Sequence, residues 1–191
     1  AALCQAFEVD SSAARLATPA PIHPPVRGAA LDVNQARLAI LQVPDRPGLA
    51  AQIFQTLATK NISVDMIIQS QRSRSIQGVM TRDIAFTVAQ MDAAAAQAVL
   101  DQAAPQIGYG AVTVDTAIAK VSIVGMGMLG QPGIAAHMFK ALAQRQINIQ
   151  MIATSEIKVS CVVAQTAGIT ALQAIHAAFN LSKPQHVELS A

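Results

Sequence analysis

Hydrophobic and polar positions follow one pattern twice along this chain of 191 residues. In the first copy an apolar run, 38–43, leads into a loop that ends in Pro47-Gly48. Leu49, Ile53 and Leu57 then recur at the spacing of a helix that buries one face. Apolar and polar residues alternate over 62–69, which is typical of a half-buried strand. The pattern predicts strand, helix, strand.

The second copy repeats this order around Pro132-Gly133, with a helical stripe of Ile134, Met138 and Leu142 and an alternating stretch, 147–153. When the Pro-Gly pairs are aligned, eight residues of the first copy recur in the second. They are Ala50, Ala51, Phe54, Leu57, Ala58, Ile62, Met66 and Ile67, matched by Ala135, Ala136, Phe139, Leu142, Ala143, Ile147, Met151 and Ile152. We interpret this as a duplication that gives two small domains.

The first copy continues with a polar connection, an alternating strand at 83–88, an alanine-rich helix at 91–103 and a strand at 111–114. This order, βαββαβ, predicts an α+β fold of the ferredoxin-like type, in which two helices cover one face of a four-stranded antiparallel sheet. The second copy has a strand at 158–164 and a helix at 169–179. Its last strand comes from 26–33 or from 186–189, and periodicity does not decide between them.

Composition narrows the function classes. Apolar residues make up 52% of the chain and charged residues 13%, so we expect filled cores and some apolar surface for association with a second copy. A net charge of +2 with 3% aromatic residues gives no basic stripe or stacking platform, so we expect no nucleic-acid partner. We also expect no membrane partner and, without a visible signal peptide, a cytoplasmic location. Cys4 and Cys161 are far apart, which predicts neither a disulfide nor a metal site, and Cys161 fits a core strand.

The residues that suggest a binding site lie in the loops before the first helix of each copy. Pro47-Gly48 sets up a helix N-terminus whose free N–H groups favour an anion by about 0.3–1 kcal/mol, so a carboxylate fits there. Asp45 either receives a ligand ammonium or caps its own helix. The second loop contains Gly125-Met-Gly-Met-Leu-Gly130, a GxGxxG pattern, but its duplicated partner lacks the glycines and the following elements do not form parallel crossovers. We therefore predict no dinucleotide, metal or other cofactor and no catalytic residues in this chain.

Beyond these patterns, the segments V-P-D-R-P-G-L-A-A, N-I-S-V-D-M-I-I-Q and N-I-Q-M-I-A-T-S-E-I-K-V-S resemble the paired ACT domains at the C-terminus of aspartate kinases. The resemblance covers about residues 26–181. It implies a first ACT domain at 37–115 and a second formed by 26–36 plus 118–181, with the N-terminal strand completing the second sheet. Residues 1–25 then form a linker or disordered arm and 182–191 a tail. The kinase catalytic domain, which binds ATP and magnesium, has no counterpart here, so the chain resembles a regulatory subunit or fragment.

The resemblance also implies a homodimer in which the first ACT domain of one chain faces the second of the other, with threonine and/or lysine bound between them. Main-chain groups of Gly48, Ala50 and Ile149 would hold the carboxylate and amine of the effector. Side chains of Asp45, Gln69, Asn148 and Ser155 would discriminate its tail. The full set of implied contacts is Asp45, Pro47, Gly48, Leu49, Ala50, Gln69, Met128, Gly133, Ile134, Ala135, Asn148, Ile149, Thr154 and Ser155.

The implied activity is feedback control of the phosphorylation of L-aspartate by ATP in lysine, threonine and methionine biosynthesis, exerted on an aspartate kinase catalytic domain or subunit. One alternative is an ACT assembly module that binds no small molecule. Another is a regulator of a different amino-acid pathway enzyme, such as a dehydrogenase or an acetohydroxyacid synthase, although T-S-E-I-K-V-S at 154–160 favours aspartate kinase. The second loop lacks an acid in the place of Asp45, so a second equivalent site is not predicted.

Overall fold

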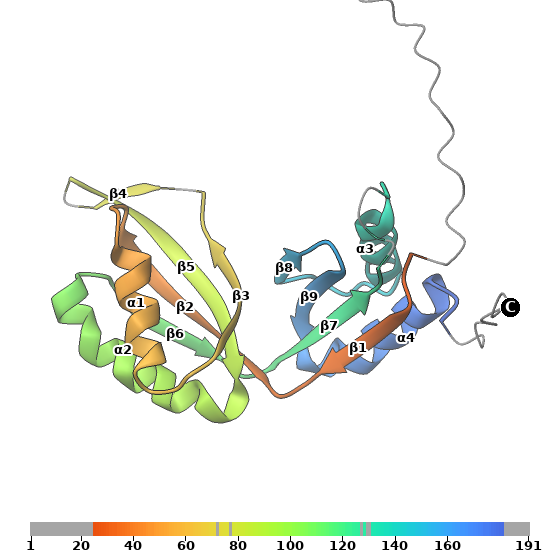
Figure 1. Cartoon of the computed structure of the whole chain (residues 1–191), viewed down its shortest axis with the longest axis horizontal. Helices are drawn as coiled ribbons and strands as arrows, with labels where there is room; N and C mark the ends of the chain where they lie inside the picture. The colour runs from red at the N-terminus through yellow and green to blue at the C-terminus, as the bar shows by residue number, and fades with distance from the viewer. Residues whose placement is uncertain (1–24, 72, 77, 127, 129–130, 182–191) are drawn as a thin grey trace, which may run out of the picture.

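The computed structural model describes residues 25–71, 73–76, 78–126, 128 and 131–181. The predicted tail and all but the last residue of the predicted arm lie outside this part of the chain. Two units, each with one antiparallel sheet, lie next to each other (Figure 1). In each unit, two long helices cover one face of the sheet, as the α+β prediction requires.

The first unit contains its elements in the predicted order. They are β2 (Gln35–Pro44), α1 (Leu49–Ala58), β3 (Val64–Gln69), β4 (Arg74–Ile76), β5 (Val79–Ala89), the short 3-10 helix η1 (Gln90–Asp92), α2 (Ala93–Ile107) and β6 (Val112–Asp115). The sheet order is β3-β5-β2-β6, and β4 pairs with the start of β5. The polar connection of the sequence thus extends β5 as a hairpin beyond the main sheet (Figure 1).

The core of the first unit lies between this sheet and α1 and α2. Ile53 and Leu57, from the helical stripe, are fully buried, together with Phe86 from β5 and Leu100 from α2. Tyr109 is nearly buried as well, and its hydroxyl donates a hydrogen bond to the carbonyl oxygen of Leu100 at 2.6 Å. Burial of these apolar side chains is what holds α1, and hence the loop before it, against the sheet.

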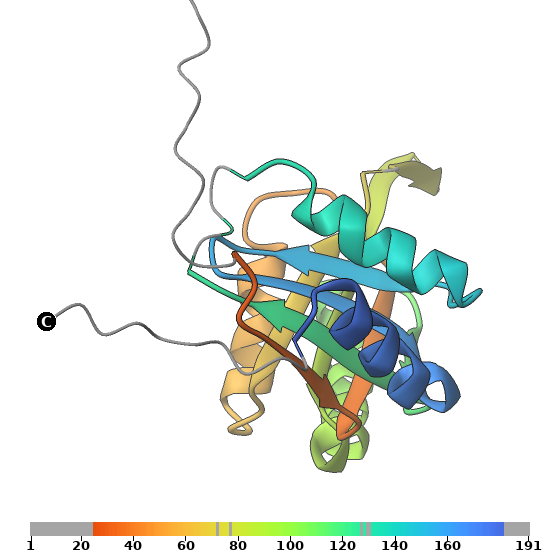
Figure 2. The same cartoon turned by 90° about the vertical axis from the view of Figure 1, so that its right-hand side faces the viewer.

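The second unit repeats the arrangement with one element from elsewhere in the chain. Its elements are β1 (Gly28–Asp32), β7 (Ile118–Val124), α3 (Ile134–Gln144), β8 (Met151–Thr154), β9 (Lys158–Ala164), the 3-10 helix η2 (Gln165–Ala167) and α4 (Gly168–Ala178). The sheet order is β1-β7-β9-β8, so β1 takes the edge that β6 takes in the first unit. β1 pairs with β7 from Gly28↔Val124 to Asp32↔Lys120. Figure 2 shows the helices of this unit in front of its sheet.

The alternating stretches after the first helices are less regular than predicted. The expected strand at 62–69 begins only at Val64, and its register shifts where Met66 has a φ of 46°. In the second unit the strand begins at Met151 rather than at 147. Ile147 instead donates its N–H to Leu142 at the end of α3 at 3.1 Å and packs against the core. Alternation of apolar residues thus continues into the connection because those side chains also need burial.

The two units meet through a small apolar cluster and an ion pair. Met66, Ile118, Met151 and Val162 are buried together, and both units contribute to this cluster. Next to it, the Nζ of Lys120 on β7 lies 2.8 Å from the Oδ2 of Asp65 on β3. The hydrogen bond from Lys120 is the main reason that the pKa of Asp65 lies below its ordinary value of 3.8. This contact fixes the sheets against each other on the side away from their helices.

Cys161 is fully buried in the core of the second unit, as predicted from the strand pattern. Burial raises its pKa to about 12, so its thiol stays protonated and unreactive at neutral pH. In the part of the chain that the structure describes, no three side chains of the metal-binding types gather as a metal site would require. The helices of that part include none with the length and apolar character needed to span a bilayer.

Candidate functional site

A cavity of about 380 Å³ lies at the N-terminal end of α1. Loop, helix and strand residues line it: Val43, Pro44, Asp45, Arg46, Pro47, Gly48, Leu49, Ala50, Gln69 and Ile84. Six of these, namely Asp45, Pro47, Gly48, Leu49, Ala50 and Gln69, are the effector contacts predicted for the first unit. The fold therefore brings around one cavity predicted contacts that are up to 24 positions apart in the sequence, from Asp45 to Gln69.

The backbone at this helix start suits an anionic group. Gly48 precedes the helix with a φ of 92°, a left-handed conformation that glycine adopts without strain. No side chain caps α1, and the first intrahelical bond begins with the N–H of Gln52, which donates to Gly48 at 3.0 Å. The preceding N–H groups of the first turn have no acceptor within the helix. They lie at the positive end of the helix dipole and can receive a carboxylate.

Asp45 does not cap the helix, so the capping alternative is wrong. Its carboxylate is instead held by Arg82 on β5, whose Nε lies 2.7 Å from Oδ2. Both side chains are partly exposed, at 33% for Asp45 and 29% for Arg82. A second contact fixes the loop, because the N–H of Asp45 donates to the carbonyl of Met80 at 2.8 Å. The carboxylate of Asp45 thus lies at the cavity and does not cap α1.

Arg82, the partner of Asp45 beside the cavity, is a residue that sequence reasoning missed. It is separated from Asp45 by 37 residues, and no local motif connects the two. The signal that could have found it is strand alternation, since Arg82 lies two positions before Ile84, which lines the cavity. Gln69 reaches the same region because it pairs with Ile84 across β3 and β5.

The predicted contacts of the second unit lie elsewhere in the chain. Thr154 and Ser155 line a different cavity, of about 260 Å³, at the junction of the units, together with Asp65, Met66, Ala153, Lys158 and Ser160. Gly133, Ile134 and Ala135 lie at the start of α3, where Gly133 has a φ of 97°. Asn148, which is exposed, and Ile149, which is half-buried, precede β8. Within one chain these residues do not line the cavity at α1.

Met128 has a structural role that the prediction did not include. Its side chain is 8% exposed and packs in the core of the second unit. Met128 belongs to the loop before α3 and anchors that loop through an apolar side chain. The loop before α1 instead places Asp45 at a cavity. The two loops therefore differ chemically although the helices that follow them start alike.

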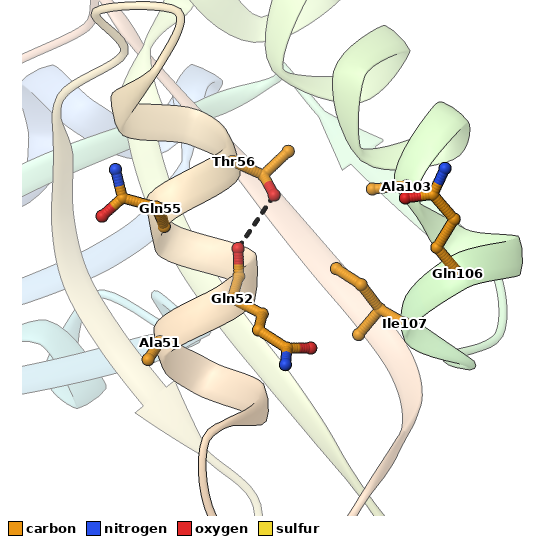
Figure 3. Close-up of a pocket in the computed structure, with 7 residues that line it drawn as sticks. All are labelled: Ala51, Gln52, Gln55, Thr56, Ala103, Gln106 and Ile107. Atoms are coloured by element: carbon orange, nitrogen blue, oxygen red, sulfur yellow. Dashed lines mark hydrogen bonds between the residues drawn. The ribbon is translucent and has the colours of Figure 1, made fainter.

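A larger cavity, of about 640 Å³, lies in the groove between α1 and α2 (Figure 3). Its lining residues are Ala51, Gln52, Gln55, Thr56, Ala103, Gln106 and Ile107. None of them is charged, and the Thr56 hydroxyl already donates a hydrogen bond to the Gln52 carbonyl at 2.8 Å. This groove has no charged side chain to pair with an ammonium or a carboxylate, whereas the smaller cavity at α1 has Asp45 and Arg46, so the smaller cavity is the better candidate for an amino-acid site.

Comparison with known proteins places both units in one domain family. Models of the ACT domain match residues 37–105 and 121–179. An aspartate kinase from Pseudomonas putida is 45% identical over 162 residues, which are 85% of this chain and 38% of that protein. An aspartokinase from Thermus thermophilus is 41% identical over 158 residues, 83% of this chain and 38% of that protein. The chain thus spans somewhat more than a third of the length of these relatives.

Solved structures give the same assignment. The aspartate kinase from Synechocystis superposes with a TM-score of 0.79 at 60% identity, over 88% of this chain and 29% of that one. The ligand-free regulatory subunit of aspartate kinase from Thermus thermophilus has a TM-score of 0.73 at 41% identity, and here the match covers 81% of this chain and 99% of the subunit. The match to this regulatory subunit thus covers nearly the whole of its length. The chain therefore belongs to the aspartate kinase family and is a regulatory region of that family, built from two ACT domains.

Proposed function

We propose that this chain is the feedback sensor of an aspartate kinase, and that it binds threonine and/or lysine at the cavity on α1. The observation that carries the proposal is the convergence of six predicted contact residues on that cavity. The carboxylate of the effector binds the free N–H groups at the start of α1, and its tail extends toward Asp45 and Gln69. Small polar amino acids match a cavity with an anion site at one end and an acid and an amide at the other.

A second copy of the chain completes the site in this proposal. β3 and β8 are edge strands, and each exposes an isoleucine at the same position of the duplication, Ile67 at 54% and Ile152 at 42%. Unpaired strand edges with exposed apolar side chains are suited to pairing with another chain. Association of β3 with β8 of a partner would bring Asn148, Thr154 and Ser155 of that partner toward the cavity.

Occupancy of the site controls a catalytic domain through linkage. An effector that binds one arrangement of the dimer more tightly shifts the population toward it, and a coupling of about 1–3 kcal/mol changes affinity roughly 5- to 150-fold. The controlled reaction in this proposal is phosphorylation of L-aspartate by ATP in the cytoplasm. One structural relative supports the choice of ligand: the E. coli aspartokinase III, 25% identical with a TM-score of 0.64, was solved in complex with lysine and aspartate.

The competing function is assembly without a small ligand. The same exposed edges, with Ile67 and Ile152, favour it because they need only a second chain. In that case the cavity at α1 stays empty and the loop serves only to start the helix. Binding of amino acids distinguishes the two functions directly.

The decisive experiment is isothermal titration of the chain with threonine and with lysine, each alone and in the presence of the other. Saturable binding near one site per chain is the expected result, and Asp45→Asn and Ser155→Ala should each weaken it by about tenfold, as loss of one hydrogen bond to a charged or polar group predicts. Asp101→Asn, an exposed acid on α2, is the matched control and should leave affinity unchanged. Absence of heat and of any melting shift with both amino acids would leave the assembly function.

A further inference from the structure

Arg82 lies where it can affect which amino acid the cavity accepts. Side chains on a strand alternate between faces, so Arg82 projects from β5 on the same face as Ile84, a lining residue, and Phe86, a core residue. It also pairs in register with Val43, another lining residue. Pairing of β5 with β2 therefore places the backbone of Arg82 beside the cavity, and the ion pair with Asp45 holds its guanidinium there.

We propose that Arg82 determines effector specificity by favouring an amino acid with a neutral hydroxyl tail, such as threonine, over one with a cationic tail, such as lysine. The inference rests on the proposed function of the cavity. Asp45 is the only acid among the residues that line the cavity, so it is the group that a cationic tail must reach. Arg82 already neutralises this acid at 2.7 Å.

The two oxygens of Asp45 explain how the cavity discriminates. Oδ2 accepts the hydrogen bond from Arg82, whereas Oδ1 has no hydrogen-bond partner among the described residues. A hydroxyl can donate to Oδ1 and leave the ion pair intact. An ammonium at Oδ1 lies close to the guanidinium and is repelled, or it displaces Arg82 and leaves that cation without its partner. Either outcome penalises a cationic tail and spares a neutral one.

The second unit has no counterpart of either Arg82 or Asp45. Ile84 of β5 pairs with Ile40, and the equivalent pair in the second sheet is Val159 with Ile123. Two positions before Val159 stands Ile157, which is 54% exposed and carries no charge. The loop before α3 has no acid either. Charge discrimination of this kind is therefore built into the first unit alone.

The test is to titrate the full chain and its Arg82→Gln variant with threonine and with lysine, and to compare the ratio of the two dissociation constants. The native chain should bind threonine more tightly than lysine. Arg82→Gln should shift the ratio toward lysine by about tenfold, the effect expected for removing one like charge at a partly exposed site. Arg82→Lys keeps the charge and should keep the threonine preference. Arg74→Gln on the neighbouring β4 removes an arginine that makes no ion pair with another described residue, and should leave the ratio unchanged.

Every other outcome of the titrations overturns the inference, and each points to a different role for Arg82 or for the cavity. Equal weakening of both amino acids in Arg82→Gln would mean that Arg82 holds the carboxylate that they share. An unchanged ratio, with native affinities, would mean that Arg82 only fixes the loop. A native chain that binds neither amino acid would remove the proposed function itself, whereas a native chain that binds both with an Arg82-independent ratio would remove only the specificity role. Melting curves of the variants verify that each is folded.

Discussion

The two units of this molecule share a sheet order and a helix start but not the chemistry before the helix. Both α1 and α3 begin after a glycine in the left-handed region, with φ of 92° at Gly48 and 97° at Gly133. In the first unit the preceding loop presents Asp45, paired with Arg82, to a cavity. In the second unit the loop buries Met128 in the core. Duplication thus preserved the scaffold, while one copy has an ion pair beside a cavity and the other has a buried methionine in the corresponding loop.

The first way to test this comparison is to damage the two cores at matched positions. Ile53 of α1 and Met138 of α3 are each fully buried, and Ile53→Ala or Met138→Ala should lower the free energy of unfolding by about 2–5 kcal/mol. We expect the loss of amide protection in hydrogen exchange to concentrate in the unit that carries the substitution. Urea unfolding followed by circular dichroism gives the size of the effect.

Gln55→Ala, an exposed position of α1, is the control and should change the unfolding free energy by less than about 0.5 kcal/mol. If either core substitution lowered protection equally in both units, the units would be a single cooperative structure. The apolar cluster of Met66, Ile118, Met151 and Val162 would then dominate the coupling.

A sharper comparison uses the paired glycines. A Cβ added at Gly48 or Gly133 meets no atom within 4 Å, so Gly48→Ala and Gly133→Ala introduce only backbone strain, about 1–2 kcal/mol in each case. Thermal melting should show similar losses of stability. Titration with threonine and lysine should show weaker binding for Gly48→Ala only, because strain there displaces the N–H groups that receive the carboxylate in the proposed function. Equal weakening by Gly133→Ala would indicate that the second loop contributes to a site after all.

The smallest expected effect concerns the ion pair between the units. The folded pKa of Asp65 lies below 3.8, mainly because of its hydrogen bond from Lys120. This pair therefore adds stability above pH 3.8, and the contribution is lost as the pH falls through the lower folded value. Because Asp65 is 52% exposed, we expect Lys120→Met to remove less than about 1 kcal/mol near neutral pH and the difference from the native chain to disappear in acid.

Urea unfolding measured between pH 7 and pH 2.5 checks this dependence on the ion pair. Lys60→Met, which removes an exposed lysine after α1, should show no such pH-dependent difference. A constant difference for Lys120→Met at all pH values would assign the effect to packing of the lysine stem instead of its charge.

Most of this architecture could be predicted from the sequence because the duplication presents the same pattern twice, so each copy supports the interpretation of the other. The helical stripes 49–57 and 134–142 are both found as helices, and β9 has the bounds 158–164 that its pattern predicted. The predictions that were wrong concern where the strand after the first helix of each unit begins and how regular it is. Met66 adopts a φ of 46° and shifts the register of β3, and no local pattern of polarity distinguishes such a bulge from a regular strand.

The candidate site was predictable only in part. The residues from Asp45 to Ala50 are contiguous, so one motif indicates all of them, and Gln69 follows from the end of the next strand. Arg82 comes from a third element, and its partnership with Asp45 depends on the register of β2 and β5, with Val43 opposite Arg82. Local sequence does not encode that register. The contacts placed on a partner chain remain predictions, since their geometry depends on a surface between two molecules.

The position of β1 has a mechanical consequence. Because the chain enters the second sheet through β1, leaves it to build the whole first unit and returns through β7, two short connections at 33–34 and 116–117 join the units (Figure 1). Two tethers resist twisting and sliding, whereas a single tether would leave the first unit free to tumble. The motion that the two tethers leave is a hinge about the line through both connections, and the apolar cluster of Met66, Ile118, Met151 and Val162 opposes it. In the proposed function, an effector bound at α1 would therefore act on β1 and β7 through an angular displacement of one sheet against the other.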